Sequence, residues 1–95
     1  MNTKDAYREK MTAQIEEQEA RLAQLKARAK QAVADGKIAL GGEIEAAEAK
    51  LTVARARLKE LSEAGDDAWE TFKDGCDEAW NSFSDACRRA MDKFK

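Results

Sequence analysis

The side chains that could perform chemistry in this 95-residue chain are two cysteines, Cys76 and Cys87, and 19 carboxylates. A cysteine or serine nucleophile needs a base beside it, and histidine most often fills that role. The chain contains no histidine, so catalytic triads and imidazole acid–base pairs are excluded. The sequence therefore predicts a protein that is not an enzyme and that needs no cofactor.

The two cysteines also do not form a disulfide or a metal site with each other. They stand eleven residues apart, which separates their Cα atoms by about 16 Å on one helix. A disulfide requires Cα atoms within about 7 Å. The acidic residues around them lack the glycine-centred loop of a calcium site; they are Asp66, Asp67, Glu70, Asp74, Asp77 and Glu78. We expect no bound metal, and interpret both cysteines as small residues of a hydrophobic core.

The element that carries both cysteines is an internal repeat. Residues 66–76 (DDAWETFKDGC) and 77–87 (DEAWNSFSDAC) are identical at six of eleven positions. Eleven residues make three turns of an α-helix, so this period keeps the same side chains on one face. The repeat therefore predicts an amphipathic helix over 66–94 with a broad aromatic face that packs on protein. Because Trp69 and Trp80 are equivalent in the repeat, we expect them to share one environment.

Upstream, a narrower apolar stripe follows helical spacing from Tyr7 to Leu61. Its steps of three and four residues continue in phase through the segment that holds Gly36, Gly41 and Gly42. We therefore predict one long coiled-coil helix over 3–63, with a possible bend or break within 36–42 at Gly41-Gly42, in preference to a hairpin turn. The glycines would leave room for aromatic rings of a helix that folds back. A second break is expected at Gly65, as a C′ residue before an N-cap at Asp66 or Asp67.

These elements predict an all-α, elongated coiled coil that forms a single domain over residues 1–95. Leu, Ile, Val and Phe together number only 14, too few for a globular core. One chain would then leave its apolar seams exposed, so we expect a homo-oligomer. The predicted packing and self-association face consists of Leu22, Leu25, Leu51, Leu58, Leu61, Trp69, Phe72, Trp80, Phe83, Met91 and Phe94.

The charge and hydropathy of the sequence indicate in which cellular compartment the protein lies and which classes of partner it can bind. The N-terminus is charged and has no apolar signal segment, and no apolar run reaches the roughly 20 residues of a membrane span. We therefore expect a cytoplasmic protein. A net charge of −2 does not favour a nucleic-acid partner. An unidentified protein partner stays open, and so does a membrane surface, although seven acids against one lysine over 66–87 disfavour it.

Four segments together resemble a family of short bacterial coiled-coil-domain proteins described as stress-response proteins. They are MNTKDAYREKMTAQIEE at the start, AKQAVADGKI in the middle, LKELSEAGDDAWE at the junction, and AWNSF with the final FK. The resemblance implies no catalytic residue and no cofactor. The leading hypothesis is thus a non-enzymatic, self-associating coiled-coil protein with a stress-response or scaffolding role. The alternative is a peripheral lipid- or envelope-associating protein that uses its eleven-residue repeats.

Overall fold

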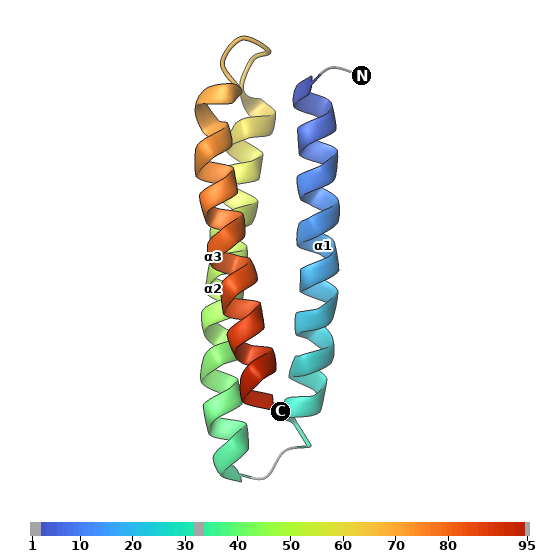
Figure 1. Ribbon diagram of the computed structural model, residues 1–95, viewed down its shortest axis with the longest axis vertical. Helices are drawn as coiled ribbons and strands as arrows, with labels where there is room; N and C mark the ends of the chain where they lie inside the picture. The colour runs from blue at the N-terminus through green and yellow to red at the C-terminus, as the bar shows by residue number, and fades with distance from the viewer. Residues whose placement is uncertain (1–2, 32–33, 95) are drawn as a thin grey trace.

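The computed structural model describes residues 3–31 and 34–94, without the side chains of 34–39 and 94. The described residues form three helices, each antiparallel to the one before it in the chain: α1 (Thr3–Ala29), α2 (Ala34–Glu63) and α3 (Glu70–Phe94) (Figure 1). Their arrangement is an elongated bundle with extents of 52 × 19 × 17 Å. No strand occurs in the described ranges. The prediction of an all-α, elongated fold is confirmed.

The prediction of one long helix over 3–63 is wrong. The chain reverses after Ala29, where the Gln31 N–H donates to the Arg28 carbonyl at 3.0 Å, and α2 then runs unbroken through Gly41 and Gly42. The phase of the apolar stripe gave the wrong prediction because an antiparallel hairpin buries the same in-phase stripe that a continuous helix would carry. The penalty of about 1 kcal/mol for each helical glycine is outweighed by the packing of α2.

The glycines of α2 do not make room for aromatic rings either. A Cβ built at Gly41 or Gly42 would meet no atom within 4 Å, so both positions face open space. The idea that they accommodate Trp or Phe side chains of the returning helix is therefore wrong for these two residues. The side-chain surroundings of Gly36 lie outside the described part of the chain.

The second connection lies at the predicted Gly65, but its geometry differs from the prediction. α2 ends at Glu63, and the Gly65 carbonyl accepts hydrogen bonds from the N–H groups of Ala68 (2.9 Å) and Trp69 (3.1 Å). No glycine of the described chain has a positive φ, so Gly65 does not adopt the left-handed conformation that is typical of a C′ glycine. Because residues 66–69 form this turn, α3 begins at Glu70 and not at Asp66.

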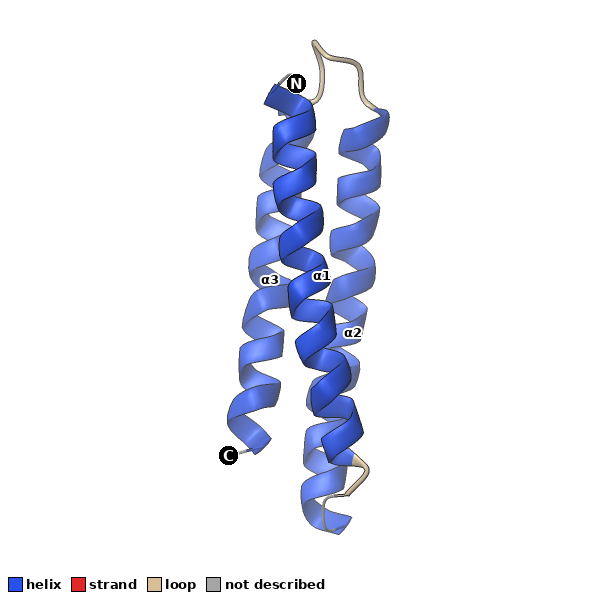
Figure 2. Cartoon of the chain, turned by 90° about the vertical axis from the view of Figure 1, so that its right-hand side faces the viewer, coloured by secondary structure: helices blue, strands red, loops and turns tan. Residues whose placement is uncertain are grey.

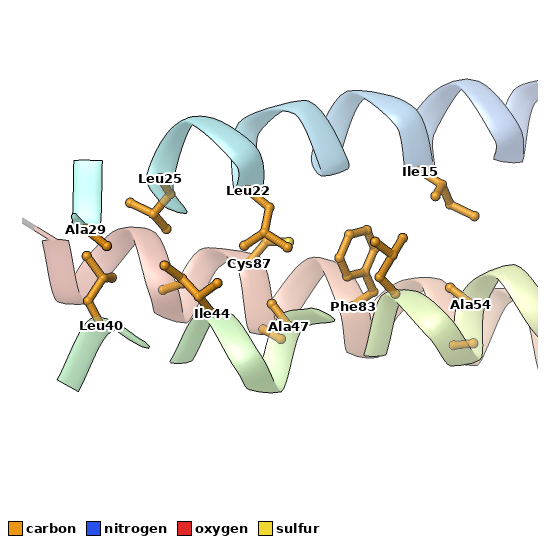
Figure 3. Packing of buried hydrophobic residues seen from close by; sticks show 14 of the residues in the cluster. Ile15, Leu22, Leu25, Ala29, Leu40, Ile44, Ala47, Ala54, Phe83 and Cys87 are labelled. Carbon is orange, nitrogen blue, oxygen red and sulfur yellow. The ribbon is translucent and has the colours of Figure 1, made fainter. Parts of the chain in front are cut away.

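The core runs along the axis where the three helices meet. Figure 3 shows Phe83 and Cys87 of α3 between side chains of α1, such as Leu22, and side chains of α2, such as Ala47. Both stripes predicted from the sequence therefore cover each other within one chain. The apolar seams are therefore covered without a second chain. Any self-association must use another surface of the bundle.

α1 packs less extensively than α2 and α3 pack on each other. Figures 1 and 2 show why: α1 lies along one side of the α2–α3 pair. Its stripe is interrupted by Gln18, whose buried Oε1 accepts no hydrogen bond within the described residues, a costly arrangement for a polar atom. Exposed ion pairs join α1 to α2, Lys26 with Glu48 at 3.1 Å and Arg55 with Glu19, and each contributes under about 1 kcal/mol.

Candidate interaction surface on α2 and α3

Both cysteines are buried and unpaired. Each has an exposed fraction of 2%, Cys87 in the main core and Cys76 in a smaller cluster with Leu61 and Trp69. Burial raises the pKa of each thiol to about 11, and the nearby Asp77 and Glu60 charges add to the effect at Cys76. Because the thiolate is the reactive form, neither side chain is poised as a nucleophile.

A polar cluster fastens the start of α1 to the other two helices. The Tyr7 hydroxyl donates a hydrogen bond to Asp77, and its ring lies 5.8 Å from that of Trp69. Burial and the Asp77 charge raise the pKa of Tyr7 well above its ordinary value, so it stays protonated as a donor. Lys4 also donates to the Ala64 carbonyl at 2.6 Å. The cluster is an anchor for α1, which the sequence did not reveal because Tyr7 and Asp77 are 70 positions apart.

A shallow groove lies on the side of the α2–α3 pair that α1 does not cover. Its volume is about 470 Å³, and none of its lining residues belongs to α1. Val53 of α2 and Phe72 of α3 both line it, with exposed fractions of 44% and 37%. They are the exposed large hydrophobic residues of the described chain. Its charged lining residues are Lys50, Arg57, Glu60 and Glu78.

The groove is lined by both apolar and charged side chains. In the monomer Arg57 already pairs with Glu60 at 3.3 Å, while a Cβ built at Gly75 would come no closer than 3.9 Å to Arg57. Apolar side chains next to charged ones are also found at protein interaction surfaces, where polar residues surround a more apolar centre.

The predicted packing face divides into three groups in the structure. Leu22, Leu25, Leu51, Leu61, Trp69 and Phe83 are buried. Leu58, Trp80 and Met91 are half-buried and pack against the main core. Phe72 is exposed although its repeat position places it on the same face of α3 as Phe83, because Trp69 fills the interior at that end of α3. The Phe94 side chain lies outside the described part of the chain.

Sequence reasoning missed Val53, the α2 half of the groove. The signal that could have found it is a second set of small and apolar residues on α2, out of phase with the core stripe, which includes Ala46, Ala49 and Ala56. The predicted stripe runs through Leu51 and Leu58 and does not include Val53. A valine between alanines and charges was therefore assigned no role.

Among the described residues there is neither a metal-binding group nor a membrane-spanning helix. They contain no group of three or more acidic or cysteine side chains placed to hold a metal ion. None of the helices, over these residues, is both long and apolar enough to cross a membrane.

Comparisons with protein-family models, with curated proteins and with solved structures find no match for this chain.

Proposed function

We propose that this protein is a non-enzymatic helical bundle that associates with itself in the cytoplasm and acts as a scaffold, in a stress-response or related role. The observation that carries the proposal is the groove on α2 and α3. Its apolar residues Val53 and Phe72 are exposed although the rest of the described large hydrophobic residues are buried or half-buried. Covering them releases water from apolar surface, which is the main driving force of protein association.

The reactive groups support a non-enzymatic role. Both thiols have a raised pKa and no exposed surface of note, and no histidine is present to act as a base. The groove offers lysine, arginine and glutamate side chains at its edge, but Arg57 and Glu60 are paired with each other. Nothing there resembles the arrangement of nucleophile, base and oxyanion donors that defines a catalytic site.

Sedimentation velocity over a range from micromolar to millimolar protein tests the proposal. We expect a sedimentation coefficient that rises with concentration towards that of a dimer. A purified protein that stays monomeric over the whole range would contradict self-association. Circular dichroism on the same samples should show helix throughout, which separates a change in association from a loss of fold.

The lipid-binding alternative has weaker support. An amphipathic helix inserts its apolar face into a membrane surface, but Phe83 of α3 and Trp69 in the turn before α3 are buried within the bundle. The bundle would have to open first. Vesicles of phosphatidylcholine with phosphatidylserine, added at low salt, should therefore leave the tryptophan emission unchanged. A large blue shift on adding vesicles would favour the lipid role instead.

A further inference from the structure

Val53, which lines the groove, also belongs to a second apolar stripe on α2. Gly42, Ala46, Ala49, Val53 and Ala56 follow at steps of four and three residues, and all five are exposed. This spacing is that of the a and d positions in a coiled coil. None of the five lines a groove between α1 and α2, so the stripe lies on a side that α1 leaves free. Small side chains at these positions allow another helix to approach closely.

Charged residues flank this second stripe in an ordered way. Each flank repeats every seven residues: Glu43, Lys50 and Arg57 on one side, and Glu45, Thr52 and Lys59 on the other. Both flanks are thus acidic towards the start of α2 and basic towards its end. Glu43, Glu45 and Lys59 form no ion pair with another described residue, so their charges are free to meet a partner.

From this pattern we infer that the second stripe of α2 binds the same stripe of a second copy of the chain, with the two helices antiparallel. The inference rests on the proposed self-association and names its interface. In this dimer Val53 of each copy packs against Ala49 of the other. Phe72, beside Val53 in the groove, becomes covered at the edge of the interface.

The antiparallel orientation follows from the flanking charges. In an antiparallel pair, each flank meets the same flank of the other copy in reverse order. Glu43 then meets Arg57 of the second copy, and Glu45 meets Lys59 of the second copy, each twice by symmetry. A parallel pair would join only Glu45 to Lys50. Lys50 meets its own copy near the two-fold axis, where Glu78 lines the same groove and offsets the repulsion.

The expected dimer is weak and reversible. The stripe from Gly42 to Ala56 spans about 21 Å of helix, and such a contact falls at the small end of specific interfaces. Exposed ion pairs add little affinity but fix the orientation. This combination predicts an association that depends on concentration and weakens with salt.

Two kinds of variant test the interface by sedimentation velocity. Ala49→Arg places a long charged side chain at the centre of the stripe, where it extends into solvent in the monomer, and should abolish the dimer. Ala13→Glu, at an exposed position of α1, is the matched control and should leave it intact. Glu45→Lys and Lys59→Glu should each raise the dimer dissociation constant about tenfold, because two attractive contacts become repulsive. The double variant Glu45→Lys/Lys59→Glu should restore it.

The outcomes separate the interface from the proposed function. Restoration by the double variant supports the antiparallel dimer, whereas restoration by Glu45→Lys/Lys50→Glu would show a parallel one. A dimer that survives Ala49→Arg would overturn this interface while leaving self-association in place. A wild-type chain that stays monomeric would overturn the proposed function as well. Unchanged helix content in every variant excludes unfolding as the cause.

Discussion

The two copies of the eleven-residue repeat in the C-terminal segment have similar sequences but different surroundings. Phe83 of the second copy is completely buried, whereas its counterpart Phe72 has an exposed fraction of 37%. The tryptophans differ in the opposite sense: Trp69 in the first copy has an exposed fraction of only 5%, whereas Trp80 in the second copy is half-buried. The expectation that both tryptophans share one environment is therefore wrong. A repeat fixes the direction in which side chains point, but the neighbouring helices decide what covers them.

The cause of the difference lies in α1 and α2. The second copy lies beside the aliphatic stretch of α1 that includes Leu22, so its phenylalanine enters the main core. The first copy meets the start of α1, where Tyr7 is the aromatic residue and packs on Trp69. Phe72 is then left beside Val53 in the open groove. One copy thus supports the bundle, and the other leaves an apolar residue for a partner.

The largest difference between the copies should appear when each phenylalanine is truncated. Phe83→Ala removes a fully buried ring from the main core and should lower the free energy of unfolding by about 3–5 kcal/mol. Phe72→Ala removes a partly exposed ring and should cost only about 1–2 kcal/mol. Urea denaturation followed by circular dichroism, at a concentration where the chain is monomeric, measures both. Equal losses would contradict the burial difference.

The next difference concerns the tryptophans. With Trp80→Phe the remaining Trp69 should emit at shorter wavelength and resist quenching by acrylamide, because its ring is buried against Tyr7 and Leu61. With Trp69→Phe the half-buried Trp80 should be quenched more readily. Tyr7→Ala should increase the quenching of Trp69 and leave that of Trp80 unchanged. If Tyr7→Ala affected both equally, α1 would not be anchored at Trp69.

A smaller effect is expected where the repeats differ by one methyl group, at Gly75 and Ala86. Gly75→Ala makes the first copy match the second and should raise the free energy of unfolding by up to about 1 kcal/mol, since alanine favours a helix over glycine. The added Cβ lies at ordinary contact distance, 3.9 Å from the Arg57 Cδ. Ala86→Gly should lower the free energy of unfolding by somewhat more than Gly75→Ala raises it, because the Ala86 side chain is buried, with an exposed fraction of 5%. Thermal unfolding compares the two directly, and a destabilised Gly75→Ala variant would show that the groove needs the glycine.

The comparison also shows what the sequence could predict. Helical phase and composition determine that the chain is helical and that Leu22, Leu51 and Phe83 lie on apolar faces, because these depend on local periodicity. Phase cannot distinguish a long helix from a hairpin, since a stripe that stays in phase is buried equally well by either. The turn after Ala29 depends on the packing of α1 against α2, which involves residues far apart in the chain.

The candidate surface was harder to predict than the fold. Phe72 could be assigned to the aromatic face by its repeat position, but its exposure depends on which residues of α1 and α2 reach that end of α3. Val53 belongs to a second stripe of small residues whose hydrophobic signal is weak beside that of Leu51 and Leu58. The anchor between Tyr7 and Asp77 joins residues from opposite ends of the chain. Contacts of this kind follow from the tertiary arrangement and leave no local pattern.

The smallest difference is expected at the cysteines, where the two copies agree. Both thiols are 2% exposed, and burial raises the pKa of each from 9.0 to about 11. A pKa that is higher in the folded state contributes stability that is fully present below pH 9 and is lost as the pH rises towards 11, because the unfolded chain then releases the proton more readily. The free energy of unfolding, measured by urea denaturation at intervals across this range, should therefore fall.

Cys76→Ala and Cys87→Ala should each reduce the slope of this fall with pH by a similar amount, and the double variant should reduce it further. The pKa of Tyr7 is also raised in the folded protein, so Tyr7 contributes to the fall in stability that remains in the double cysteine variant. Tyr7→Phe should reduce that remaining fall. A slope that one cysteine variant alone removed would show that the repeats bury their thiols unequally, against the symmetry that the sequence and the structure share at this position.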